Sequence, residues 1–169
     1  MHRLLTKIDR KAYHPVVISL LKKGAIAYKI EKLGITVHSL GLSSIINLVP
    51  TLIKLVVILR NTNPQIVHAF MIHAAFFGGI IARLLNIPII IWNIFSTDLS
   101  FQTNKVGTTL IIKVCALLSR IIPNKIIFDS HSAYSAHQLE GYFFRKMEII
   151  NNGVDTDIFS PNGKKYDQY

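Results

Sequence analysis

The sequence predicts an α/β fold, a Rossmann-like parallel sheet with helices on both faces. Short apolar runs alternate with longer stretches in which apolar residues recur every three or four positions, which is the pattern of βαβ units. A chain of 169 residues suits one domain, and the 50% of hydrophobic residues exclude wholesale disorder. These observations favour a parallel sheet with right-handed crossovers.

The first elements alternate in this way. Residues 1–10 have the character of a helix, and residues 15–20 (PVVISL) are rich in β-branched residues, as in a buried strand. Residues 25–33 predict a helix that Gly34 terminates. Residues 35–40 (ITVHSL) predict the second strand.

A longer helix is expected over residues 45–60, where Pro50 limits the first turns. Residues 61–64 (NTNP) break this helix, and residues 65–70 (QIVHAF) predict the third strand. Helical spacing resumes over residues 74–85.

Two glycines, Gly78 and Gly79, lie inside that last helix and lower its propensity, which indicates a close approach between helix and sheet. Residues 89–94 (IIIWNI) form a continuous apolar run, typical of a strand covered on both faces. Residues 96–105 are polar and predict a loop.

The remaining chain predicts two more helices and two more strands, namely a helix at 108–121, a strand at 125–128, a helix at 132–139 and a strand at 146–150. In parallel sheets, ligands bind at the carboxyl ends of the strands. Function is therefore expected in the loops that follow strands, at residues 68–73, 93–100, 129–132 and 151–157.

The charge balance favours anionic partners. The formal net charge is +10, and no acidic residue lies between Glu31 and Asp98. Nucleic acid is not expected, because no dense Lys/Arg run is interleaved with aromatic residues. The apolar composition makes an anionic membrane surface the better candidate, although residues 45–59 are too short for a bilayer-crossing segment. We expect a cytoplasmic protein, with peripheral attachment at the inner face of the membrane as a further candidate.

Several kinds of chemistry lack support in the sequence. Cys115 lies in an apolar run and reads as a buried, inert thiol, and no Cys/His set has zinc-finger spacing, so no bound metal is expected. Neither G-x-G-x-x-G nor a Walker A motif is present, which removes the main support for an oxidoreductase that binds a dinucleotide.

Two stretches resemble glycosyltransferase family 4, which has the GT-B fold. The first is PQIVHAFMIHA at residues 64–74, followed by GGIIARL at residues 78–84, and the second is IINNGVDTDIFSP at residues 149–161. The run from Ser130 to Tyr142 is also similar to the family's pattern. The Asn-Gly-Val-Asp segment is the most specific part of a resemblance that extends from about residue 13 to residue 161.

The resemblance implies the N-terminal, acceptor-binding half of a GT-B enzyme, apparently truncated at both ends. Residues 1–159 would form the Rossmann-like domain, with its first strand missing, and residues 160–169 a polar tail at the interdomain hinge. Loss of that central strand should leave its two neighbours unpaired or force them together. The donor-binding domain would be a missing partner, and no cofactor would be bound by this chain, the nucleotide sugar being the donor substrate.

The resemblance also implies site residues. His73 is the candidate catalytic residue, with a local hydrogen bond at a helix start as the alternative. The candidate substrate-binding residues are His68, Ser96, Thr97, Ser130, Asn152 and Gly153. His68 also suits a core histidine, and Ser96 and Thr97 also suit helix caps. Asn-Gly after a strand is expected to turn with positive φ beside a cleft.

The implied function is transfer of a sugar from a nucleotide-sugar donor to a glycan, lipid or polysaccharide acceptor. The partner would then be an acceptor glycan or a lipid-linked sugar, and this chain alone should be inactive. The alternative is a non-catalytic, truncated Rossmann-like binding module.

Overall fold

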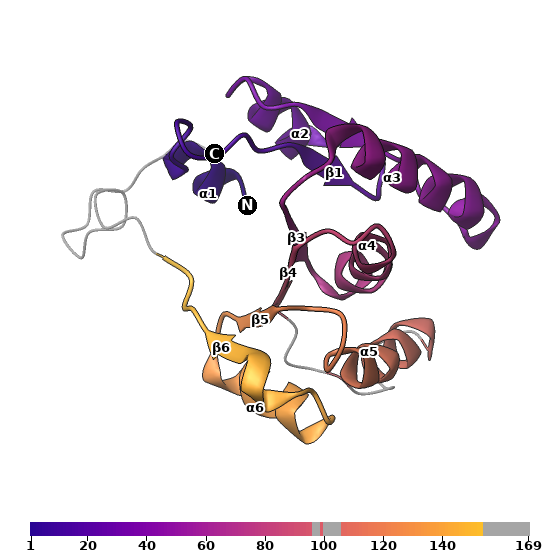
Figure 1. Cartoon of the computed structure of the whole chain (residues 1–169), viewed down its shortest axis with the longest axis vertical. Helices are drawn as coiled ribbons and strands as arrows, with labels where there is room; N and C mark the ends of the chain where they lie inside the picture. The colour runs from indigo at the N-terminus through magenta and orange to yellow at the C-terminus, as the bar shows by residue number, and fades with distance from the viewer. Residues whose placement is uncertain (96–98, 100–105, 154–169) are drawn as a thin grey trace, which may run out of the picture.

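The computed structural model describes residues 1–95, residue 99 and residues 106–153. The elements follow in chain order (Figure 1): α1 (His2–Lys7), β1 (Val17–Ser19), α2 (Ala25–Glu31), β2 (Val37–Ser39), the short 3-10 helix η1 (Ile45–Asn47), α3 (Leu48–Thr62), β3 (Ile66–Phe70), α4 (Ile72–Leu84), β4 (Ile89–Ile94), α5 (Val106–Leu118), β5 (Lys125–Phe128), α6 (His131–Leu139), the 3-10 helix η2 (Phe144–Lys146) and β6 (Met147–Ile149).

The α/β class and every expected strand and helix are confirmed. β4 and β5 have the expected bounds, whereas α4 begins at Ile72, two residues before the expected start. α3 continues to Thr62, beyond the expected end, because Asn63 takes the left-handed conformation (φ 40°) that closes the helix. Gly34 also has positive φ (73°), as its place after α2 requires.

The strands form two parallel sheets instead of one. β1 pairs with β2, and β3, β4, β5 and β6 pair in that order. The register places Val17 beside Val37, and Phe70 beside Asn93. Within the described residues, β1 and β3 each pair along one edge only. β1 and β3 do not pair with each other, and whether a further strand belongs between them stays a prediction.

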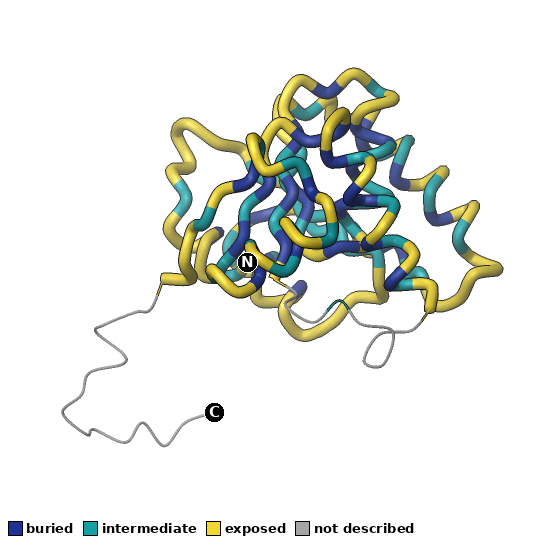
Figure 2. Tube along the Cα trace, turned by 90° about the horizontal axis from the view of Figure 1, so that it is seen from below, coloured by how far each residue is buried: buried dark blue, intermediate teal, exposed yellow. Residues whose placement is uncertain are grey.

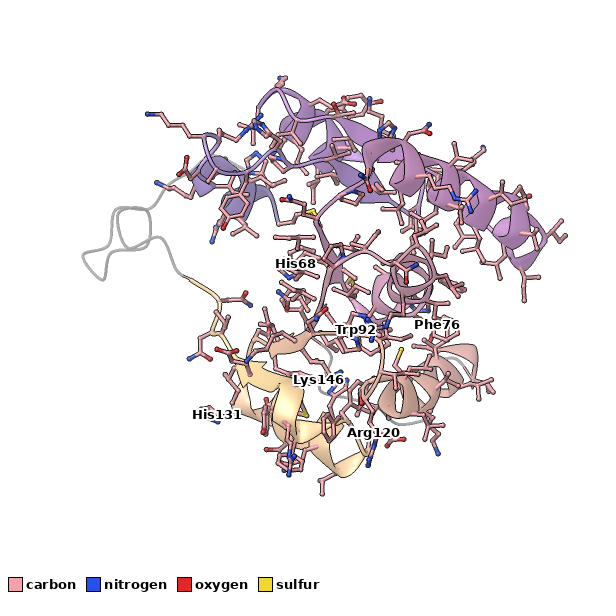
Figure 3. The ribbon with its side chains drawn as sticks, viewed as in Figure 1. His68, Phe76, Trp92, Arg120, His131 and Lys146 are labelled. Atoms are coloured by element: carbon pink, nitrogen blue, oxygen red, sulfur yellow. The ribbon has the colours of Figure 1, made fainter. Side chains whose placement is uncertain are left out.

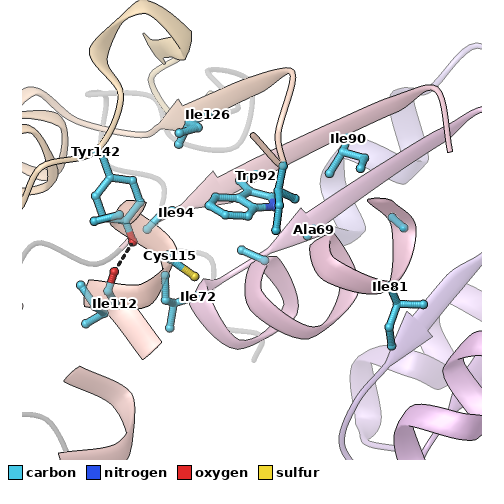
Figure 4. Close-up of a cluster of buried hydrophobic side chains, with 14 of the residues drawn as sticks. Ala69, Ile72, Ile81, Ile90, Trp92, Ile94, Ile112, Cys115, Ile126 and Tyr142 are labelled. Atoms are coloured by element: carbon cyan, nitrogen blue, oxygen red, sulfur yellow. Dashed lines mark hydrogen bonds between the residues drawn. The ribbon is translucent and has the colours of Figure 1, made fainter. Parts of the chain in front are cut away.

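The main core lies between the four-stranded sheet and α4, α5 and α6. Trp92 is fully buried in this core among Ile72, Ile90 and Cys115 (Figure 4). The hydroxyl of Tyr142 donates a buried hydrogen bond to the carbonyl of Ile112 at 3.2 Å. A second, smaller cluster forms around α1 and α2 from Leu5, Ile30 and Ile35.

The close approach predicted from the glycine pair is confirmed for one glycine only. A Cβ built on Gly79 would lie 2.6 Å from Nε1 of Trp92 and 3.2 Å from Cγ2 of Ile122. A Cβ on Gly78 would meet no heavy atom within 4 Å. Only Gly79 therefore lets α4 lie close to β4.

The prediction that β4 is covered on both faces is wrong. Its residues alternate between buried and partly exposed, with Ile90, Trp92 and Ile94 buried and Ile89 40% exposed. Figure 1 shows α4 and α5 on one side of β3–β5, and Figure 2 shows the buried residues gathered in the interior. In the described part of the chain, the second face of this sheet is thus the less covered one.

Candidate functional site

The carboxyl ends of β3 to β6 meet at one edge of the four-stranded sheet, because the strands are parallel and adjacent. The described residues that follow these strands include Met71, His73, Phe95, Asp129 and Asn152. The topology therefore brings all four expected loops, at least in part, to a single edge.

The junction between β3 and α4 is strained. Met71 has φ 72° and ψ 159°, a region that residues with a Cβ rarely adopt, at a cost of about 1–3 kcal/mol. Its amide donates to the carbonyl of Asn93 at 2.8 Å, which fixes the turn against β4. Met71 and Phe95, with Ile72 and Ile94, line a small cavity of about 50 Å³ at this edge.

His73 occupies the second position of α4, and its side chain is exposed. No side chain among the described residues caps the N-terminus of α4, so none of them supplies a side-chain acceptor to the first amides of the helix at this edge. The predicted catalytic His73 therefore lies beside hydrogen-bond donors, where an acceptor hydroxyl could contact both.

An aromatic row leads from the less covered sheet face to this edge. The rings of His68 and Phe70 stack with centroids 4.3 Å apart, and Phe70 and Phe95 stack at 6.3 Å. In Figure 3, His68 lies on the opposite side of β3 and β4 from Phe76 of α4. Asn93 pairs in register with Phe70, so its side chain shares the face of His68.

Two polar atoms on this face lack a partner. Nε2 of His68 and Oδ1 of Asn93 are buried and make no hydrogen bond among the described residues. Burial lowers the pKa of His68, so its imidazole is neutral near pH 7. A neutral imidazole and an amide offer both donors and acceptors, which suits the hydroxyl groups of a polar substrate.

A second polar cluster joins β5 and β6. The carboxylate of Asp129 accepts from Nδ2 of Asn152 at 3.2 Å and from the hydroxyl of Ser130 at 3.4 Å. Ser130 is also the N-cap of α6, where its Oγ accepts from the amide of Ala133 at 3.2 Å. Two of the predicted substrate-binding residues, Ser130 and Asn152, are thus brought together through Asp129.

The other predicted residues have different outcomes. Ser96 and Thr97 lie outside the described residues. Gly153 is exposed, and the prediction that it turns with positive φ is wrong, since the described glycines with positive φ are Gly34, Gly41 and Gly141.

Three residues of the edge were missed as individual candidates, namely Phe70, Phe95 and Asp129. Their loops were expected to carry function, but an aromatic or acidic residue at a strand end looks the same whether it packs, caps or binds. Side chains alternate between the two faces of a strand, so His68 and Phe70, two residues apart in β3, lie on the same face. This alternation is the sequence signal that could have linked Phe70 with the predicted His68.

Among the described residues, no group of three or more His, Cys, Asp or Glu side chains is placed to hold a metal ion. Cys115 is fully buried, and burial raises the pKa of its thiol to about 12, as expected for an inert cysteine.

Ser130→Ala is expected to remove both the α6 cap and one contact of Asp129, at a cost of about 1 kcal/mol. Hydrogen exchange should then accelerate at the start of α6. Ser135→Ala, an exposed change inside the same helix, is the control and should leave exchange unchanged. Equal exchange in both variants would contradict the capping role.

A comparison with known protein families shows which family the chain belongs to. The family model described as "Glycosyl transferase 4-like" matches residues 1–130. The chain belongs to this glycosyl transferase 4-like family. No curated protein matches the chain.

Solved structures of Anabaena Alr3699/HepE are among those that resemble this family member. The structure in complex with UDP-glucose has a TM-score of 0.70 at 19% identity, over 86% of this chain and 38% of the other. The structure in complex with UDP has a TM-score of 0.69 at 18% identity, over 89% and 41% of the two chains. At this identity the likeness establishes the fold, which is α/β, Rossmann-like and similar to part of HepE. The chain spans about two fifths of the length of that protein.

Proposed function

We propose that this member of the glycosyl transferase 4-like family supplies the acceptor-binding side of a glycosyltransferase. The reaction is transfer of a sugar from a nucleotide sugar to a hydroxyl of a glycan, lipid or polysaccharide acceptor. One observation supports this proposal above all. The carboxyl edge of one sheet holds His73, the aromatic row and the Asp129–Asn152 cluster.

Each part of this edge has a role in the proposal. The imidazole of His73 and the amides at the start of α4 orient the acceptor hydroxyl. His68 and Asn93 provide hydrogen bonds on the adjoining sheet face, beside the apolar rings of Phe70 and Phe95. Asn152 is held by Asp129 and keeps its amide oxygen for the substrate.

The donor is proposed to bind on a donor-binding domain outside residues 1–169. The HepE complexes contain UDP-glucose and UDP, which makes UDP-glucose the first donor to test. The single, buried thiol and the basic surface fit a cytoplasmic location near an anionic leaflet.

The chain on its own is expected to bind an acceptor but to transfer no sugar. Fluorescently labelled protein is applied to an array of glycans and lipid-linked sugars, and turnover is followed separately with radiolabelled UDP-glucose and the bound acceptors. We expect binding to an acceptor class without incorporation of label.

Two variants sharpen this experiment. His73→Ala should weaken acceptor binding about tenfold, because it removes one oriented polar contact to the substrate. His14→Ala removes an exposed histidine that is far from His73 in the sequence. This variant is the control and should bind normally. Failure to bind any acceptor would overturn the acceptor-binding role. Transfer by the chain alone would overturn the need for a separate donor domain.

A further inference from the structure

The outward face of α3 is apolar, which is unusual for a helix on a protein surface. Ile45 and Ile46 of η1 are 85% and 84% exposed, and Val49, Ile53 and Val57 of α3 are 65%, 59% and 49% exposed. Val49, Ile53 and Val57 recur every four residues and therefore form one row along the helix. We call these five residues the α3 apolar face.

The opposite side of the same helix packs into the protein. Thr51, Leu55 and Leu59 are buried, and Leu55 and Leu59 belong to the main core. The helix is therefore apolar on both sides, although only one side is buried in the core. Singly exposed apolar residues are ordinary, but a continuous row of them marks an interaction surface.

Basic residues flank the α3 apolar face. Lys54 and Arg60 are exposed on the same helix, and neither pairs with a carboxylate of the described residues. The nearest acidic residues in sequence are Glu31, which pairs with Lys23 at 2.7 Å, and Asp98. A groove of about 390 Å³ adjoins the helix, lined by Ile53, Lys54 and Val57 and by residues of β2.

We propose that the α3 apolar face docks on an anionic lipid bilayer. An apolar row inserted at the level of the headgroups, with cations beside it, is the pattern of helices that lie in the membrane interface. Lys54 and Arg60 then meet lipid phosphates, which attract each cation close to the surface.

The observations favour a bilayer over a second copy of the chain. The net charge of +10 makes two copies repel one another, and η1, α3 and the strands on either side of them contain no acidic residue to meet Lys54 and Arg60. An anionic leaflet supplies both an apolar interior and negative charge in one surface.

The helix lies on the bilayer instead of crossing it. The stretch Ile45–Thr62 has 18 residues and a mean hydropathy of 1.5, so by length and composition it could cross a membrane, contrary to the sequence expectation for residues 45–59. The packing of Leu55 and Leu59 in the core, in contact with α4, holds one side of the helix against the protein. A helix held along its length in this way presents one face only.

Co-sedimentation with vesicles tests the proposal. The full chain is mixed with vesicles of phosphatidylcholine alone or of phosphatidylcholine with phosphatidylglycerol, at low and at high salt. We expect the protein to bind the anionic vesicles, and we expect this binding to weaken as the salt concentration rises. Salt screens the attraction between the basic side chains and the lipid phosphates. Absence of binding to anionic vesicles at low salt would overturn the proposal.

Variants locate the surface. Ile46→Ser with Ile53→Ser should weaken partitioning at least about tenfold, and Lys54→Gln about fivefold. The matched control, Leu110→Ser with Leu117→Ser, removes two exposed apolar residues of α5 that are 61% and 75% exposed and should bind normally. Equal losses in both double variants would overturn the assignment to α3. So would dimers in free solution, measured by light scattering, that Ile53→Ser dissociates. Circular dichroism checks that each variant is folded.

Discussion

Gly79→Ala is expected to destabilise the protein by about 1–3 kcal/mol. The added Cβ would lie 2.6 Å from Nε1 and 3.1 Å from Cε2 of Trp92, a ring that is fully buried and cannot move aside freely. The better helix propensity of alanine stabilises the folded protein by at most about 1 kcal/mol. The clash is therefore expected to outweigh it, and the free energy of unfolding should fall. Denaturant unfolding measures the change.

Gly78→Ala is the matched control one residue earlier in the same helix. No heavy atom lies within 4 Å of its added Cβ, so only the gain in helix propensity of about 0.5–1 kcal/mol remains. The two substitutions should therefore shift stability in opposite directions. A Gly79→Ala protein as stable as the Gly78→Ala protein would contradict the packing of α4 on Trp92.

Stability is expected to fall as the pH drops below about 6.5, by up to about 1.4 kcal/mol per pH unit for each buried histidine. His137 is fully buried, and its Nδ1 donates to the carbonyl of Ala133 at 2.9 Å, which leaves Nε2 without a partner among the described residues. Burial is the main cause of the lowered pKa of His137, and it lowers the pKa of His68 too.

The sign follows from proton binding. The folded pKa lies below the unfolded value, so between these two values the unfolded chain binds more protons, and stability present above about pH 6.5 is lost as the pH falls. Two other buried groups, Cys115 and Tyr142, do not titrate in this range, because burial raises the pKa of Cys115 to about 12 and also raises that of Tyr142.

His137→Phe tests this origin. Phenylalanine keeps a ring beside Phe128 and Tyr142, whose centroids lie 5.0 and 4.8 Å from that of His137, but it has no proton to gain. The slope of unfolding free energy against pH should therefore become shallower below pH 6.5. The exposed His14→Ala serves as the control and should keep the original slope. An unchanged slope in His137→Phe would show that other groups cause the acid sensitivity.

The local sequence determined the helices and strands, because the patterns that predict them lie within the segments themselves. The β-branched runs of β4 and β5 set those strands to the residue, and Ser130 begins α6 because its hydroxyl caps the first turn. The candidate edge was also predictable in outline, since loops after parallel strands must meet at one side of a sheet. His73, Ser130 and Asn152, which the family resemblance implied as site residues, follow β3, β5 and β6 at this edge.

The tertiary structure decided which surfaces are covered. The apolar run of β4 and the apolar sequence of α3 look alike in composition, yet β4 is buried on one face and α3 leaves Val49 and Ile53 in solvent. Hydrophobic periodicity reports that a residue is apolar and on which side it lies, but not whether a neighbour covers that side. The division into two sheets and the contact of Asp129 with Asn152 likewise depend on residues far apart in the chain, which no local pattern encodes.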